Sequence, residues 1–313
     1  MADTSTLRLI DFHSHHVPPR FELTTTRSGD EAARRRWAHI NQRISDEAAL
    51  VEAIKQDDIA GRVVNIPTAL FARPGEVFVP DLYRSVNDDA SALVARHRGL
   101  AGLASVDAFS GEAGAREVER ARGLGLAGLF VESAQGDLLL DAPEAFPTLA
   151  AAAAAGLPVF VHPINPSYLL AQVSGYGRVG TLFARGTINA AALIALIEGG
   201  VFARLPDLRV VVTTLAFGGL FLSAAFATGE RDPTTRLLRR HVYIDTMGLH
   251  PKLIRASVDL LGADNVLLGT DWPIVSDGEI QARVEAALDK AGLSETERRA
   301  VAGDNARRLF FGS

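Results

Sequence analysis

The chain has 313 residues, of which 48% are hydrophobic and 22% charged, proportions ordinary for a globular protein with a large core. Its formal net charge of -5 argues against a nucleic-acid-binding role, because such proteins usually carry a basic face. The chain has no cysteine, which excludes disulfides, thiolate metal sites, a catalytic cysteine and iron–sulfur clusters. Any metal ion must therefore be held by His, Asp or Glu.

No targeting or membrane-spanning segment is expected. Met1–Asp11 has no apolar core of signal-peptide length, and no continuous apolar run reaches the roughly 20 residues of a membrane span. The run Ala150–Ala155 is too short and ends at Gly156, which is typical of a helix cap. The local basic cluster Arg34–Arg36 is interpreted as a solvated helix face. We expect a cytoplasmic protein that binds neither nucleic acid nor membrane.

Eight apolar runs of strand length alternate with segments of helical composition. The expected strands are Leu7–Phe12, Arg62–Ile66, Leu100–Val106, Leu126–Val131, Leu157–Val161, Leu208–Thr213, His241–Asp245 and Asn265–Gly269. The expected helices between them include Asp46–Ala60, Ala113–Leu124, Ala142–Ala155 and Pro251–Leu261. Near-continuous apolar strands that alternate with helices indicate an α/β protein whose parallel sheet is covered on both faces.

Eight is the number of strands that closes a (β/α)8 TIM barrel, and the chain length fits one. An open doubly wound sheet is the alternative, but it would usually show a Gly-rich turn after its first strand, where Asp11–His16 has no glycine. We predict a single barrel domain over residues 1–313. Two long loops, residues 17–45 and 163–186, are expected over the barrel mouth as lids or substrate walls, with surface decoration as the alternative.

Histidines are concentrated at the end of the first expected strand. Residues two apart on a strand point to the same face, so His13 and His15 would project together into the barrel mouth. Two such imidazoles can share one metal ion. His16 would point the other way and is interpreted as a packing or hydrogen-bonding residue. Asp11 points with the pair and could orient a ligand histidine by accepting a hydrogen bond.

Two other expected strands also end in polar residues. His162 follows Val159–Val161, and Asp271 follows the run that ends at Gly269. A polar residue at the C-terminal end of a barrel strand is typical of a catalytic group, although a core histidine or a loop-anchoring carboxylate is the alternative for each alone. Together with the first pair they place three imidazoles and one carboxylate at one barrel end. Zinc and related divalent ions favour such a set.

On these motifs the chain resembles the amidohydrolase superfamily, in the amidohydrolase-2 branch that includes aminocarboxymuconate-semialdehyde decarboxylase and 6-methylsalicylate decarboxylase. The matching segments are Asp11–His15, Phe160–Pro163, Leu205–Val211 and Leu268–Pro273. The resemblance implies a (β/α)8 barrel, a homodimer and one catalytic divalent metal ion, usually zinc, with manganese or cobalt as alternatives. It also implies that His13, His15, His162 and Asp271 are the metal ligands.

The sequence departs from the family at the end of the sixth strand. The family normally has a histidine there, followed closely by glycines, whereas this chain has Thr214 before Gly218 and Gly219. A threonine hydroxyl cannot act as a base near neutral pH, so Thr214 is a candidate for substrate binding. Three explanations remain open: Asp271 serves as both ligand and base, His250 or Glu132 has taken over, or the activity has changed or been lost.

Five further side chains are candidates for the site. Glu132 ends the fourth strand and could be an extra ligand, a base or a substrate-orienting group, with a salt bridge to an arginine as the alternative. His250 could act in catalysis or simply precede Pro251 at a helix start. Trp272 could line the pocket or pack in the core. Arg178 and Arg185 could pair with a substrate carboxylate, and solvated loop charges are the alternative.

These observations predict a metal-dependent enzyme acting on a small molecule. The branch points first to decarboxylation of a small aromatic or unsaturated carboxylic acid, with Asp271 as the proton-transfer residue. Hydrolysis of an amide, a lactone or an activated aromatic ring is the second hypothesis, because it needs only metal-activated water and Asp271. A non-catalytic barrel that binds a ligand or partner is the third, motivated by the missing strand-six histidine.

Overall fold

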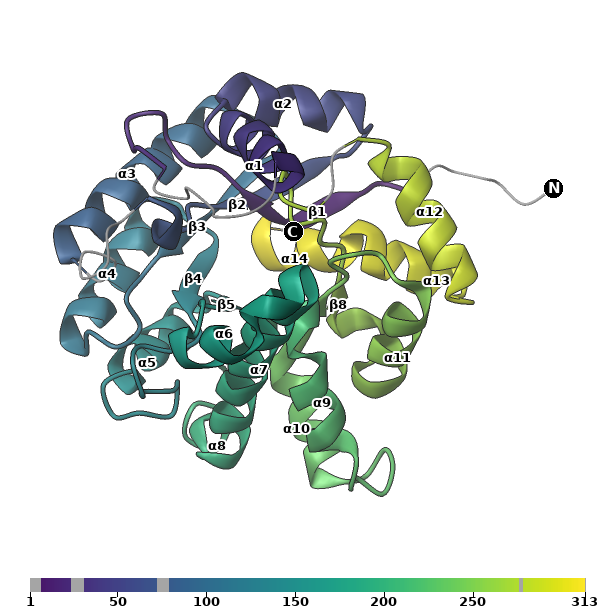
Figure 1. Cartoon of the computed structure of the whole chain (residues 1–313). Coiled ribbons are helices and arrows are strands. Elements are labelled where there is room, and N and C mark those ends of the chain that lie inside the picture. The colour runs from purple at the N-terminus through teal and green to yellow at the C-terminus, as the bar shows by residue number, and fades with distance from the viewer. Residues whose placement is uncertain (1–6, 24–30, 72–78, 276–277, 313) are drawn as a thin grey trace. The chain divides into compact units, whose positions relative to one another are not determined.

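A computed structural model describes residues 7–23, 31–71, 79–275 and 278–312 (Figure 1). Its eight strands form one sheet in the order β1 to β8, and the pairs β1–β2, β2–β3, β4–β5, β5–β6 and β6–β7 are parallel. The strands are β1 (Ile10–His15), β2 (Gly61–Asn65), β3 (Leu100–Ser105), β4 (Gly128–Glu132), β5 (Val159–His162), β6 (Val210–Val212), β7 (Val242–Asp245) and β8 (Val266–Leu267). Helices alternate with them, which confirms the predicted (β/α)8 TIM barrel.

The helices vary from single turns to more than twenty residues. The α-helices are α1 (Glu31–Ile44), α2 (Glu47–Gln56), α3 (Pro80–Arg96), α4 (Glu112–Gly123), α5 (Phe146–Ala155), α6 (Ser167–Val173), α7 (Gly177–Glu198), α8 (Val201–Arg204), α9 (Phe217–Ala224), α10 (Pro233–His241), α11 (Pro251–Leu261), α12 (Ile280–Lys290), α13 (Glu295–Arg299) and α14 (Asn305–Phe310). Short 3-10 turns are η1 (Thr68–Leu70), η2 (Ser174–Tyr176), η3 (Thr214–Ala216) and η4 (Ala263–Asn265), and η5 (Ala300–Asp304) is π-helical.

The chain divides into two compact units. Unit 1 comprises Met1–Leu103 with Thr246–Ser313, and unit 2 comprises Ala104–Asp245. The single-domain assignment therefore stays a prediction.

In unit 1, β1 has backbone hydrogen bonds to the β8 segment as well as its pairing with β2. The Phe12 N–H donates to the Leu268 carbonyl over 2.7 Å, and the His15 N–H donates to the Trp272 carbonyl over 2.9 Å. The register between β1 and β2 shifts between Asp11 and Ser14, so β1 carries an extra residue there. Such bulges bend a strand and re-aim its side chains, and they are common beside active sites.

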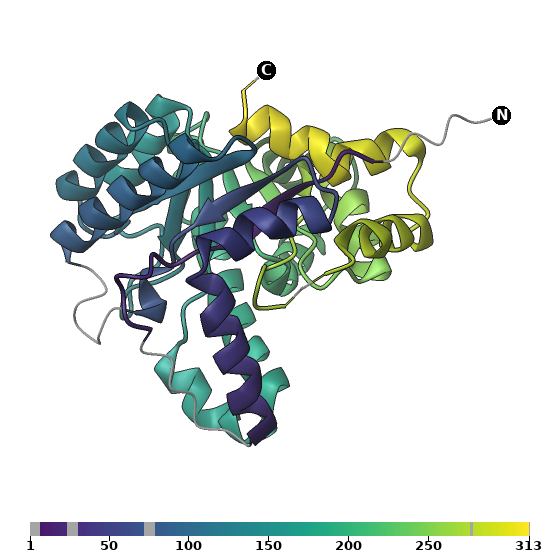
Figure 2. The ribbon, with the colours of Figure 1, turned by 90° about the horizontal axis from the view of Figure 1, so that it is seen from above.

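The helices of unit 1 take two different positions relative to its strands. The helices α2 and α3 lie outside β2 and β3, as crossover helices of a barrel do (Figure 1). By contrast, α1 extends away from these strands (Figure 2). This helix occupies most of the described part of the predicted loop 17–45, because the segment after Glu31 is rich in helix-forming Ala and Arg.

In unit 2, β4 pairs with β5 so that Glu132 lies beside His162. Asn189, a buried residue of α7, fixes the helix to the sheet: its amide donates to the Val161 carbonyl over 3.0 Å, and it accepts from the Thr213 hydroxyl over 2.9 Å. The predicted loop 163–186 is also largely helical, since it contains α6, η2 and the start of α7.

One helical stretch of unit 2, Ser167–Glu198, is long and apolar enough to cross a membrane by length and composition alone. It is not a continuous apolar run, because Gly, Ser and two Arg interrupt its apolar residues. Its α7 part packs against α9 and η3, as a barrel helix does. A core helix of a globular protein passes the same test, so the stretch is weak support for a membrane span.

Candidate metal centre and active site

Three of the predicted ligand side chains converge within unit 1. The Nε2 atoms of His13 and His15 are 3.2 Å apart. The Oδ1 atom of Asp271 is 2.9 Å from His15 Nε2 and 3.5 Å from His13 Nε2. All three residues are buried, with 1%, 1% and 8% of their surfaces exposed. The two-residue spacing of the histidines therefore brings their rings together, and the end of β8 brings in the carboxylate.

This geometry fits a divalent metal ion. Ligands about 2.1 Å from one ion lie roughly 3.0–3.4 Å from one another in tetrahedral or octahedral arrangements. The three observed separations span that range. Two imidazole nitrogens and a carboxylate oxygen are also donors that zinc and manganese accept. The side chains present in unit 1 thus satisfy both the distance and the donor requirements of such an ion.

Asn65, at the end of β2, orients His15 and was missed from the sequence. Its Oδ1 atom lies 2.7 Å from His15 Nδ1, and its amide nitrogen donates to the Ser14 carbonyl over 3.1 Å. Because the amide nitrogen is thus engaged, Oδ1 accepts a hydrogen bond from the Nδ1–H group of His15, which leaves His15 Nε2 with a lone pair for a metal. A polar residue closing an apolar strand was the available signal, the same one that identified His162.

A buried ionic network lies behind the unit 1 ligands. The Asp11 carboxylate accepts hydrogen bonds from the backbone N–H groups of His13 (3.2 Å) and Thr270 (2.9 Å) and is paired with the guanidinium of Arg62. Arg62 is fully buried and also pairs with Asp57 over 3.2 Å. Asp11 was predicted to orient a ligand ring, whereas its bonds hold the backbone beside the ligands.

Trp272 packs in the core of unit 1 and does not line an open surface. It is fully buried against Leu50, Ala53, Val64, Leu93 and Leu100. The Arg62 guanidinium lies 5.3 Å from its ring centroid, within cation–π range. The preceding Asp271 has a φ of 55°, a left-handed conformation that Asp tolerates better than most residues. The packed indole therefore anchors the segment that turns the Asp271 carboxylate toward the histidines.

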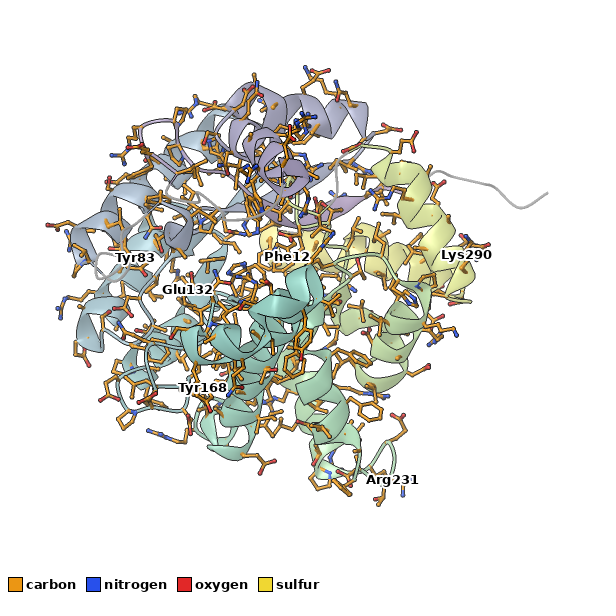
Figure 3. The ribbon with its side chains drawn as sticks, in the orientation of Figure 1. Phe12, Tyr83, Glu132, Tyr168, Arg231 and Lys290 are labelled. Atoms are coloured by element: carbon orange, nitrogen blue, oxygen red, sulfur yellow. The ribbon has the colours of Figure 1, made fainter. Side chains whose placement is uncertain are left out.

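Unit 2 contributes a second group of polar side chains. Glu132 ends β4, as labelled in Figure 3, and its Oε2 atom is 3.7 Å from His162 Nδ1 at the end of β5. Arg185, on α7, approaches the other ring nitrogen of the imidazole, with Nη2 3.4 Å from Nε2. Its Nη1 donates to Asn165 Oδ1 over 3.1 Å. Arg185, predicted from sequence as a substrate-binding residue, thus stands beside a predicted metal ligand.

Glu132 is buried without a hydrogen-bond partner in the described part of the chain, and this holds for both carboxylate oxygens. Burial raises the pKa of Glu132 to about 7, although the positive charge of Arg185 acts in the opposite direction. A native protein keeps few such groups, because an unsatisfied buried polar atom is costly. The position therefore indicates a functional role.

Thr214 occupies the position where the family normally has a histidine, and it forms hydrogen bonds within unit 2. The Thr214 hydroxyl donates to the Asp245 carbonyl over 2.7 Å, and its backbone N–H donates to Asp245 Oδ1 over 2.8 Å. These bonds fix η3 to the end of β7. Thr214 remains a predicted substrate-binding residue, but its hydroxyl proton is already engaged.

Two other predicted residues are solvent-exposed. Arg178 lies in the first turn of α7, and His250 directly precedes α11 with Pro251 at the first helical position. The backbone carbonyl of His250 accepts from Leu253 and Ile254, so the residue begins the helix. Roles for Arg178 in substrate binding and His250 in catalysis stay predictions.

The sequence of this chain matches a known protein family. Residues 10–312 match the amidohydrolase family. The chain belongs to that family. It is accordingly an enzyme, and a non-catalytic barrel is set aside.

Two proteins of similar sequence are named as decarboxylases. The chain is 26% identical to gamma-resorcylate decarboxylase of Polaromonas sp. over 72% of its length and 75% of the relative. It is 25% identical to 2-amino-3-carboxymuconate-6-semialdehyde decarboxylase of Dictyostelium discoideum, over 86% of this chain and 78% of the other.

Solved structures show the same fold. A 5-carboxyvanillate decarboxylase from Sphingomonas paucimobilis superposes with a TM-score of 0.80 at 23% identity, covering 98% of this chain and 99% of that one. A dihydroxybenzoic acid decarboxylase from Polaromonas sp. JS666, with bound manganese and the inhibitor 2-nitroresorcinol, gives 0.81 at 21% identity and covers 97% of each chain.

Proposed function

We propose that this enzyme is a divalent-metal-dependent decarboxylase of a small aromatic or unsaturated carboxylic acid. The observation that carries the proposal is the convergence of His13, His15 and Asp271, whose ligand atoms lie 2.9–3.5 Å apart. The decarboxylase relatives support the reaction class. They act on small unsaturated or aromatic acids according to their names.

We propose that one divalent ion is held by His13, His15, His162 and Asp271, the ligand set that the family's motifs imply. The C-terminal ends of parallel barrel strands face one end of the barrel, which is where His162 ends β5. When bound, the ion would supply a positive charge that draws electron density from the substrate's oxygens. Zinc suits the ligand set, and manganese is the ion in the related solved structure.

The chain's own residues would bind the substrate and move the proton. Loss of carbon dioxide leaves an electron pair on the carbon, which must then take up one proton. Asp271 is the proposed proton-transfer residue because its carboxylate lies among the ligand histidines. Arg185 is proposed to bind the substrate's carboxylate, since its fork of N–H donors matches that group.

Hydrolysis of an amide, a lactone or an activated aromatic ring is the second candidate. Thr214 favours it, because its hydroxyl bonds to the Asp245 carbonyl and supplies no imidazole for decarboxylase chemistry. Asp271 alone would serve as the proton shuttle for hydrolysis. The two candidates differ in product, since only decarboxylation releases carbon dioxide.

The first experiment measures metal content by elemental analysis in wild type and in a His13→Ala/His15→Ala variant. We expect about one equivalent of divalent metal in wild type and its loss in the variant. Wild type is then loaded with zinc, manganese or cobalt and assayed for carbon dioxide release from hydroxylated aryl acids. Wild type that takes up none of these ions contradicts the proposal, and product formation by water addition without carbon dioxide favours hydrolysis.

We also propose a cytoplasmic homodimer. Side chains on α6, η2 and α7 of unit 2 offer an apolar surface suited to a second copy: Tyr168, Tyr176, Val179 and Phe183 are 74%, 76%, 75% and 59% exposed. Tyr168 is labelled on this surface in Figure 3. Analytical ultracentrifugation of wild type and of a Val179→Asp/Phe183→Asp variant tests it. A monomeric wild type contradicts the homodimer.

A further inference from the structure

The buried carboxylate of Glu132 lacks a hydrogen-bond donor among the described residues. Only 4% of the residue is exposed, and neither oxygen has a hydrogen-bond partner in the described segments. A buried carboxylate without a hydrogen bond is costly, and a nearby donor would offset that cost.

His162 Nδ1 is such a group. It lies 3.7 Å from Glu132 Oε2, slightly beyond hydrogen-bond length, and the two residues are register partners on adjacent parallel strands. The imidazole is also in contact with the rings of Phe130 (centroids 4.9 Å apart) and Phe160 (5.9 Å). Since the strands fix the backbones and the rings restrict the imidazole, the Glu132 side chain is the group left to move toward His162 Nδ1.

Unit 1 has the same arrangement of an acceptor and a ligand histidine, and there the hydrogen bond between them is formed. There the side-chain oxygen of Asn65, on the strand next to β1, lies 2.7 Å from His15 Nδ1, and His15 Nε2 points at Asp271. Glu132 stands in the same relation to His162, from the neighbouring strand and on the Nδ1 side. The difference is that Glu132 carries a full negative charge when ionised, whereas Asn65 is neutral.

We infer that Glu132 is a positioning residue. It accepts a hydrogen bond from the Nδ1–H group of His162 and so fixes His162 as a metal ligand through Nε2. The inference rests on the proposed function, because it assumes that His162 binds the ion. A carboxylate on the far nitrogen orients a ligand histidine and raises its basicity. Arg185, now 3.4 Å from Nε2, would keep its bond to Asn165 and leave the nitrogen to the ion.

The test measures the metal dissociation constant by chelator competition, for zinc and for manganese. We expect Glu132→Ala to weaken binding by about 10–100-fold, as loss of such a partner typically does. Glu132→Gln should weaken it less, because an amide oxygen still accepts a hydrogen bond but carries no charge. Glu117→Gln is the matched control: Glu117 is also a mostly buried glutamate of unit 2, but it pairs with Arg120 on α4. The metal affinity of the Glu117→Gln variant should equal that of wild type.

A spectroscopic readout separates positioning from direct coordination. In zinc-loaded protein labelled with 15N-histidine, we expect His162 to be protonated at Nδ1, with faster exchange of that proton in Glu132→Ala. The absorption intensity of the cobalt form should indicate the same coordination number in both proteins. Coordination through Nδ1, or a ligand lost in Glu132→Ala, overturns the inference.

The two proposals fail in different ways. If wild type binds no metal, the proposed function fails and the inference fails with it. If wild type binds metal but Glu132→Ala binds it equally well, only the inference fails, and a rise in KM alone would then assign Glu132 to the substrate.

Discussion

The polar groups at the strand ends of the two units differ in how firmly they are held. In unit 1, Asn65 fixes the His15 ring and Asp11 fixes the backbone of His13 and Thr270. In unit 2, Glu132 has no hydrogen-bond partner among the described residues, and the Glu132–His162 approach stops at 3.7 Å. The fold of unit 1 thus already closes the hydrogen bond that orients its ligand histidine, whereas the equivalent Glu132–His162 pair of unit 2 is still open.

The arginines near the two groups of polar residues differ in the same way. Arg62 of unit 1 is fully buried between Asp11 and Asp57, so its charge is neutralised inside the protein. Arg185 of unit 2 is partly exposed on α7, where its guanidinium can meet a substrate. If this division is right, substitutions behind the unit 1 ligands should act on stability, and substitutions in unit 2 should act on binding and pH dependence.

The largest expected effect is on the buried network of unit 1. Arg62→Met leaves Asp11 and Asp57 as buried charges without their counterion, which typically lowers the free energy of unfolding by about 3–5 kcal/mol. Urea unfolding of the metal-free protein measures the change. Arg96→Met is the control, because Arg96 makes an exposed ion pair with Glu47 and its loss should cost far less. Equal effects of the two substitutions would remove the structural distinction drawn for unit 1.

A smaller effect concerns the pH dependence of unit 2. Burial raises the pKa of Glu132 to about 7 from 4.5, so the folded state keeps a proton that the unfolded state releases between those values. The free energy of unfolding should therefore fall as the pH rises from about 4.5 to 7, by up to about 3 kcal/mol. Glu132→Gln stays neutral and removes this loss.

Urea unfolding of both proteins in chelator at pH 5 and pH 8 tests this prediction. The stability of Glu132→Gln relative to wild type should be greater at pH 8 than at pH 5, because only wild type then buries a charge. The titrations of other groups cancel in the difference. The same relative stability at both values would show that Glu132 has an ordinary pKa, and would weaken the contrast between the units.

The smallest expected effect is at Thr214. Thr214→Val keeps the shape but removes the hydrogen bond to the Asp245 carbonyl, which should lower the free energy of unfolding by about 0.5–1.5 kcal/mol. Because that bond already occupies the hydroxyl proton, kcat/KM should change by less than about threefold. Steady-state kinetics on an aryl acid that the carbon dioxide assay finds to be a substrate give the answer. A drop of a hundredfold or more in kcat would instead make Thr214 part of the catalytic machinery.

The sequence determined the fold and the ligand positions that depend on strand periodicity. The alternation of eight apolar runs with helices predicts the barrel, and the spacing of His13 and His15 predicts two imidazoles on one face. The beginning of β1 at Ile10 was not predicted, because a strand begins where its pairing begins, here at Ile10 opposite Gly61 of β2. The helices in the segments 17–45 and 163–186 were expected as loops, since their apolar residues are sparse or interrupted.

Only the tertiary structure decided which residues from distant segments of the chain contact one another. Neither Asn65 on the His15 ring nor Arg62 between two carboxylates follows from local pattern, because strand ends become neighbours only when the sheet forms. The same holds for Trp272, whose place in the core depends on packing against β2 and α2. Residue type and period are local properties and can be read from the chain, whereas burial and pairing are created by folding.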